Sequence, residues 1–192
     1  MRARRLAFAA AVLLGLSLGP AWIQARETYD AIPGSGLIEY AFTPGSDAAG
    51  LIIRTLRGAR NAVYVQAFSF THVDIARALI EAHRRGVEVQ VIADAGQTEK
   101  IEHNVISRLV RAGVPVMLDA EHVSAHNKVM VIDPDGEQPV VITGSFNFTF
   151  AAQYRNAENL LVLRGNRELA RAYLDNWQRH REHARRYHDG QE

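Results

Sequence analysis

Two neighbouring stretches decide the fold: HNKVMVID at residues 126–133 and GSFNFT at residues 144–149. The first is typical of a buried strand, because apolar residues follow its histidine and lysine. Alternate side chains of a strand share a face, so His126 and Lys128 lie side by side and Asp133 lies on the other face. The histidine and the lysine are both costly to bury without partners. They suit chemistry on phosphate, because imidazole is a nucleophile and proton carrier near neutral pH and an ammonium attracts a non-bridging oxygen.

The second stretch supplies further donors. The β-branched run at residues 140–143 predicts a strand that returns antiparallel to the first and brings Gly144, Ser145 and Asn147 to the end that carries the histidine. Gly144 lets the backbone come close, while the Ser145 hydroxyl and the Asn147 amide can donate to an anionic oxygen. Asp133 ends its strand, and we expect it to hold the turn at residues 133–136 in a structural role.

H-x-K-x4-D followed by G-S-x-x-N resembles the signature of the phospholipase D superfamily. GSFNFT, with NAEN at residues 156–159 shortly after, is similar to its small secreted bacterial endonucleases, which carry one motif per chain. Ten residues separate Asp133 from Gly144 here, more than is usual for the family, and we read the extra ones as a longer hairpin tip. The resemblance implies a catalytic histidine at His126, with no metal ion and no cofactor.

Glu158 is a further candidate for the site. A histidine that attacks as a neutral ring needs its other nitrogen held by an acceptor, and a carboxylate fixes that tautomer and stabilises the imidazolium. In the family, an acidic residue downstream of the motif orients the histidine, and Glu158 matches it by position. The alternative is an exposed glutamate at the start of a strand.

The first residues carry an export pattern. A basic start with three arginines precedes an apolar run at residues 6–18, which is shorter than the roughly 20 residues that a spanning helix needs. We therefore expect a signal peptide at residues 1–25, a single phospholipase D-like domain at residues 26–192, and a periplasmic or secreted protein without stable membrane insertion. An uncleaved anchor is the alternative.

Composition limits the class of protein. Cysteine is absent, which excludes disulfides, thiolate chemistry and zinc sites built on cysteine. Removal of residues 1–25 would leave 19 of the 22 basic residues against 21 acidic ones, a net charge of about −2. Bulk charge therefore does not predict a nucleic-acid partner, and any electrostatic attraction must come from a local patch.

Alternating strand and helix patterns predict the fold. The expected strands cover residues 37–42, 62–68, 87–93, 114–118 and 158–163, and the expected helices, the first capped by Ser46, cover residues 47–57, 71–85, 98–112 and 168–188. Together with the motif hairpin they predict an α/β fold, an α-β-α sandwich around a mixed, largely parallel sheet.

Other histidines allow weaker hypotheses. His122 lies four residues before His126, but in a loop that spacing does not indicate a metal site, and we expect a surface histidine or one that contacts substrate. His180, His183 and His188 resemble a metal cluster, yet the arginines among them favour a solvated helix face or a nucleic-acid contact. His72 follows a predicted strand and is a possible neighbour of the site.

A single motif is half of a catalytic apparatus. Cleavage through a histidine needs a nucleophile on one side of the phosphorus and an acid on the other, and one imidazole cannot occupy both sides. Lys100 has no histidine two residues before it, so we expect a homodimer that brings two copies of His126 together. The expected substrate is DNA, or also RNA, bound through its backbone. The alternatives are a phospholipase acting on lipid headgroups and an inactive nucleic-acid-binding member of the family.

Overall fold

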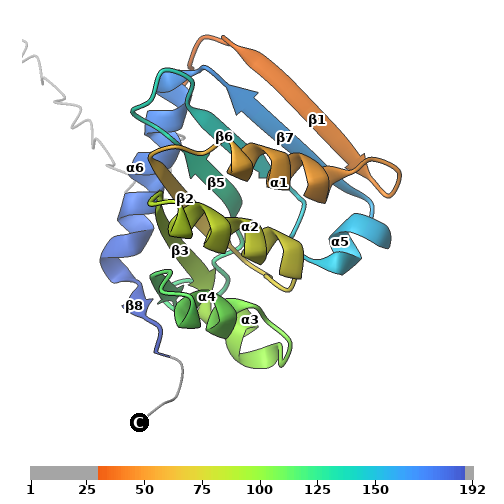
Figure 1. The fold of residues 1–192 in the computed structure, drawn as a ribbon, viewed down its shortest axis with the longest axis vertical. Helices are drawn as coiled ribbons and strands as arrows, with labels where there is room; N and C mark the ends of the chain where they lie inside the picture. Colours follow the sequence, from red (N-terminus) through yellow and green to blue (C-terminus); the bar gives the residue numbers. More distant parts are fainter. Residues whose placement is uncertain (1–29, 189–192) are drawn as a thin grey trace, which may run out of the picture. The chain divides into compact units, whose positions relative to one another are not determined.

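The motif strand lies inside a mixed sheet with helices on both faces (Figure 1). The structure is a computed structural model, and it describes residues 30–188. In chain order its elements are β1 (Leu37–Thr43), α1 (Ala48–Arg57), β2 (Ala62–Ala67), α2 (Val73–Arg84), β3 (Glu88–Asp94), α3 (Ala95–Lys100), α4 (Ile106–Arg111), β4 (Val116–Asp119), β5 (Lys128–Ile132), β6 (Val140–Gly144), α5 (Phe150–Tyr154), β7 (Glu158–Arg164), α6 (Arg167–His183) and β8 (Arg185–Arg186).

The sheet has eight strands in the order β1-β7-β6-β5-β2-β3-β4-β8. The α/β class is confirmed, but the expectation of a largely parallel sheet is wrong. In the described part of the chain only β2 with β3 and β3 with β4 pair in parallel, and the five other pairings are antiparallel. The reason is that β5 and β6 form a hairpin, the short α5 between β6 and β7 does not carry the chain across to a parallel position, and β1 pairs with β7 at the far edge instead of with β2.

The two faces of β5 bury different cores. Met130 and Ile132 face the larger core, to which α1, α2, α4 and α5 contribute. Val129 and Val131 face the smaller core under α6, where Trp177 packs on Tyr64 at a ring-centroid distance of 4.8 Å and donates from Nε1 to the carbonyl of Val65. The strand is therefore apolar on both faces because both are covered.

Three element boundaries differ from the sequence prediction. The helix expected at residues 98–112 is interrupted, because Asn104 donates to the carbonyls of Thr98 and Ile101 and accepts from Ile106 N at the start of α4. The cap of α1 is Asp47, whose carboxylate accepts from Gly50 N, and not Ser46. The last helix ends at His183, since residues 185–186 pair with β4 as β8.

The expected leader at residues 1–25 lies outside the described residues. From Ile32 onward the described chain forms one compact unit. None of its helices is both long and apolar enough to cross a membrane.

Asp133 ties the end of β5 to the start of β2. Its carboxylate accepts three backbone N–H groups, from Arg60 at 2.9 Å, Asn61 at 2.7 Å and Ala62 at 2.9 Å. Its own backbone has φ of 47°, a left-handed conformation that aspartate tolerates better than most residues. These contacts lie at the opposite end of β5 from His126.

We expect Asp133→Ala to destabilise the fold without removing chemistry. The change leaves three N–H groups without their charged acceptor and puts alanine at positive φ, so the free energy of unfolding should fall by about 3 kcal/mol. Urea denaturation measures this loss. Asp135→Ala is the matched control: its exposed ion pair with Arg171 is worth less than about 1 kcal/mol. Equal losses in the two variants would contradict the role of Asp133.

Candidate active site

The candidate catalytic residues gather at one end of the sheet. Ala67, the last residue of β2, pairs with Lys128, the first residue of β5. Gly144, the last residue of β6, pairs with Leu160 of β7, two residues from Glu158. Directly paired residues of antiparallel strands have side chains on the same face, so Lys128 and Glu158 belong to one face of the sheet. The register brings together residues that lie 30 positions apart in the sequence.

His126 lies just before β5 and is exposed, whereas Lys128 is 5% exposed. Pairing with β2 continues past the strand, because Phe68 N donates to the carbonyl of Asn127. The Lys128 Nζ lies 2.9 Å from His126 Nδ1 and donates to the His126 carbonyl at 2.7 Å. The predicted neighbourhood of the two side chains is therefore present, and it is a direct contact.

The ring of Phe68 packs against both residues. Its centroid lies 4.2 Å from that of the His126 ring and 4.7 Å from Lys128 Nζ. Burial lowers the pKa of Lys128 to about 8, and the opposing charge of Glu158 raises it in part. An ammonium near an apolar wall is weakly hydrated, so it interacts more strongly with an anion that reaches it.

The contact between Lys128 and His126 links the charge of one residue to the tautomer of the other. A protonated Lys128 donates to Nδ1 and leaves the proton of a neutral ring on Nε2. A neutral amine can instead accept from Nδ1–H, which leaves a lone pair on Nε2. Among the described contacts of His126, none involves Nε2. That nitrogen is the one available to substrate.

Glu158 does not lie where a carboxylate that orients His126 is expected. Its two oxygens accept from Ser145 Oγ at 2.6 Å and Asn156 Nδ2 at 3.0 Å, and within residues 30–188 no hydrogen bond joins it to His126. Ser145 Oγ also accepts from the backbone N–H of Asn159. In this structure the charge of Glu158 therefore favours the ammonium form of Lys128, and its carboxylate orients the Ser145 hydroxyl.

Gly144 permits the close approach of β6 and β7 that this arrangement requires. Its φ is +148°, and a Cβ at this position would lie 2.3 Å from the carbonyl oxygen of Asn159. Any other residue would push the two strands apart and move Ser145 away from Glu158. The prediction that Gly144 serves the backbone agrees with this geometry.

The segment that contains Asn147 lies beside the segment that contains His72. Phe148 forms a bridge with Phe70, and its carbonyl accepts from the backbone N–H groups of Thr71 and His72. Asn147 Oδ1 and His72 Nδ1 are buried without a hydrogen-bond partner among the described residues. Burial lowers the pKa of His72, against the charge of Asp47. No described group therefore donates a hydrogen bond to the amide oxygen of Asn147.

Two histidines of the last helix are not solvated as the sequence predicts. His180 and His183 meet His122 around the buried carboxylate of Asp119, a residue that the sequence analysis did not single out. His188 is exposed. The only sequence signals for this cluster were the spacings of three between Asp119 and His122 and between His180 and His183.

Comparison with known proteins identifies the family. The family model described as cardiolipin synthase, PLD-like domain, matches residues 52–181, which is more than half of the chain. The chain belongs to the phospholipase D superfamily. Within this superfamily the chain is a phosphodiesterase, and the H-x-K-x4-D and G-S-x-x-N residues described above lie within the matched range.

Relatives of known name support this assignment. The chain is 39% identical over 140 residues to a phospholipase D of Rickettsia felis, covering 73% of this chain and 67% of the relative. It is 29% identical over 166 residues to the human mitochondrial cardiolipin hydrolase, covering 83% and 64%. The crystal structure of Nuc from Salmonella typhimurium, a phospholipase D family member, matches with a TM-score of 0.74 and 30% identity over 80% of this chain and 99% of Nuc.

The ionisation of Lys128 is directly measurable, because the sequence has only one other lysine, Lys100. In 15N-lysine-labelled protein one side-chain amine should titrate near pH 8, as the ammonium below and the neutral amine above that value. Lys128→Arg should remove this signal and Lys100→Arg should retain it. Glu158→Gln should lower the pKa of Lys128 further, because the carboxylate favours the ammonium. Two signals that both titrate near the ordinary value of about 10.4 would contradict the burial effect.

Proposed function

We propose that this phosphodiesterase is an exported endonuclease that cleaves DNA, or also RNA, through a covalent phosphohistidine and without a metal ion in the reaction. The observation that carries the proposal is the exposed His126 ring held at Nδ1 by a buried Lys128, with Nε2 open to substrate. A nucleophile beside a phosphate-binding cation is what phosphoryl transfer requires.

The reaction takes two steps. Substrate binding is proposed to move the Lys128 ammonium from His126 Nδ1 to a phosphoryl oxygen, so that the neutral ring carries its proton on Nδ1 and a lone pair on Nε2. His126 Nε2 then attacks the phosphorus, the bond from phosphorus to the leaving oxygen breaks, and an imidazolium on the opposite side protonates that oxygen. The second imidazole, which is neutral after it has donated its proton, then removes a proton from water. The water oxygen attacks the phosphorus, and the P–N bond to His126 breaks. Lys128, Ser145 and Asn147 are proposed to bind the phosphoryl oxygens. Loss of one such donor typically costs on the order of a hundredfold in rate.

The second imidazole is proposed to be His126 of a second copy of this chain. An exposed apolar surface supports a homodimer: Tyr40 and Phe42 of β1 and Leu161 of β7 share one sheet face at the edge of the sheet and are 67%, 60% and 37% exposed. This edge patch lies near the site along the strand but on the opposite face of the sheet, because Phe42 pairs with Asn159 while Glu158 pairs with Thr43. Large contiguous apolar surfaces of this kind are typical of interfaces.

Two classes of substrate are candidates: nucleic acid and a lipid phosphodiester. The single motif and the GSFNFT stretch resemble the small bacterial endonucleases, which favours nucleic acid. The names of the relatives, phospholipase D and mitochondrial cardiolipin hydrolase, favour a lipid phosphodiester instead. The chain spans about two thirds of the length of these relatives, so their whole activity is not transferred, and nucleic acid remains our proposal.

Export is proposed from the leader pattern at residues 1–25. The signal peptide would leave a catalytic domain at residues 26–192 in the periplasm or outside the cell. N-terminal sequencing of the protein released from an expressing bacterium tests this step. A fraction of intact chains that stays with the cytoplasm would contradict it.

We expect His126→Ala to abolish turnover while the chain stays folded, because no other described side chain replaces its nucleophile. Hydrolysis of a chromogenic phosphodiester measures the loss, and His103→Ala, a change at an exposed histidine, is the control that should retain the wild-type rate. Acid-quenched wild-type enzyme should carry a phosphoryl group on His126. A near-normal rate in His126→Ala would remove the proposal.

Mixed dimers test the shared site. If each dimer has one site built from two His126 side chains, refolding one part wild type with nine parts His126→Ala should leave about one hundredth of the activity per total chain, the square of the wild-type fraction. Activity that falls only in proportion to the wild-type fraction would show that one histidine suffices.

A substrate panel separates the two classes of substrate. The purified protein is incubated with plasmid, single-stranded RNA and cardiolipin vesicles, each with and without excess chelator. We expect cleavage of the plasmid in chelator. Cleavage of cardiolipin alone would replace nucleic acid by lipid, and strict dependence on added magnesium would contradict the phosphohistidine mechanism.

A further inference from the structure

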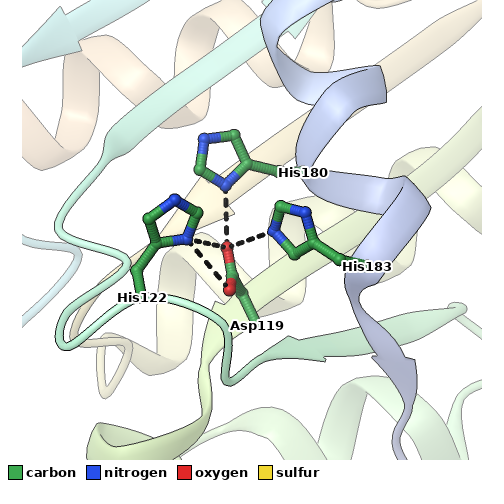
Figure 2. Close-up of side chains that lie close together, drawn as sticks. All are labelled: Asp119, His122, His180 and His183. Atoms are coloured by element: carbon green, nitrogen blue, oxygen red, sulfur yellow. Dashed lines mark hydrogen bonds and ion pairs between the residues drawn. The ribbon is translucent and has the colours of Figure 1, made fainter.

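Four side chains converge at a second place in the fold (Figure 2). Asp119 is the last residue of β4, and His122 follows in the loop to β5. His180 and His183 come from the end of α6, so two segments about 60 residues apart supply two ligands each. One ligand atom of each residue lies within 4.8 Å of the others. Figure 2 shows the three imidazole rings directed at the carboxylate from different sides.

Three ring nitrogens surround the carboxylate of Asp119. Its side chain is completely buried, and its Oδ2 lies 2.7 Å from His180 Nδ1, 3.2 Å from His183 Nε2 and 3.3 Å from His122 Nδ1. His122 Nδ1 is also 3.3 Å from Oδ1, which accepts from Glu121 N, so hydrogen bonds from the three rings can fill the lone-pair sites of both oxygens. The same convergence suits a cation, because a ring that does not donate directs a lone pair toward the centre of the cluster.

The electrostatics of the carboxylate favour a cation as well. A carboxylate at this position has no access to water, because its side chain is fully buried, and three imidazole rings face it. A buried anion of this kind requires positive charge close by.

We propose that Asp119, His122, His180 and His183 form a binding site for a divalent transition-metal ion, with Zn²⁺ as the best fit. Three imidazole nitrogens and one carboxylate oxygen are ligands that zinc prefers in tetrahedral geometry, whereas calcium and magnesium require six or more oxygens. Bonds of about 2.0–2.1 Å to tetrahedral ligands leave neighbouring ligand atoms about 3.3 Å apart. The contacts of 3.2 and 3.3 Å to Asp119 match this spacing, and the contact of 2.7 Å requires a small opening. The four ligand atoms lie within 4.8 Å of one another, so binding would draw the more distant ones toward the ion.

The role of the ion follows from its place. Four protein ligands complete a zinc coordination sphere, so the site is structural and leaves no open position for a substrate. It joins the end of α6 to the loop that leads to His126. The second half of that loop is already held, because the buried Asp94 accepts from Ala125 N at 2.8 Å. Zinc would hold the first half and so support the residue that carries the nucleophile.

Zinc binding is measured on the untagged full chain, because a polyhistidine tag would bind zinc itself. After removal of metal with a chelator and buffer exchange, calorimetric titration with zinc chloride should show one equivalent per chain. Free zinc at a hundred times the dissociation constant should raise Tm by roughly 5–10 °C. Co²⁺ in place of zinc should give the intense visible absorption of a four-coordinate ion.

Two variants with a matched control make the test specific. His122→Ala and His183→Ala should each weaken zinc binding at least about tenfold, and both remove partly exposed rings, so the fold should survive. His103→Ala removes an exposed histidine outside the cluster and should bind like the wild type. Absence of stoichiometric binding, or equal binding in all three variants, would overturn the proposal. The readouts need no substrate, so their failure is separate from failure of the proposed nuclease reaction.

Discussion

The antiparallel pairing of β5 with β2 on one side and β6 on the other is the constraint on which the site depends. A shift of one residue in this register would turn Lys128 to the opposite face of the sheet and exchange the apolar residues of β5 between the two cores. Asp133 opposes such a shift from the far end of the strand, because its carboxylate holds the backbone that leads into β2. The structural aspartate and the proposed catalytic histidine of the motif thus serve one strand from its two ends.

Burial of Lys128 has a cost and a consequence. The side chain lies among strand ends and the ring of Phe68, where an ammonium is poorly hydrated, and its pKa falls accordingly. The same loss of water strengthens its attraction for a phosphoryl oxygen, which brings the charge that the pocket lacks. Glu158 moderates the effect, because it keeps a negative charge near the lysine while its oxygens bind Ser145 and Asn156.

Two buried aspartates organise the loop between β4 and β5, and they follow parallel neighbouring strands. Asp94 at the end of β3 accepts from the loop backbone near His126, and Asp119 at the end of β4 receives the three histidines. The carboxyl ends of parallel strands meet at one edge of a sheet, which is why these groups lie near the reactive histidine. The parallel part of the sheet therefore supports the loop, and the antiparallel part supplies the side chains that are proposed to bind phosphate.

The sequence by itself determined the class of fold, the motif strand and the proximity of His126 and Lys128, because strand periodicity and local spacing are encoded within a few residues. It also predicted a structural place for Asp133. Only the tertiary structure decided that the sheet is mostly antiparallel, that Glu158 binds Ser145 instead of His126, and that Asp119 gathers three histidines. These features depend on which strands become neighbours and on where α6 ends, and such long-range contacts leave no periodic pattern in the chain. For the same reason the sequence predicted a solvated face for the histidines of the last helix, because the carboxylate partner of His180 lies 61 residues away in the chain.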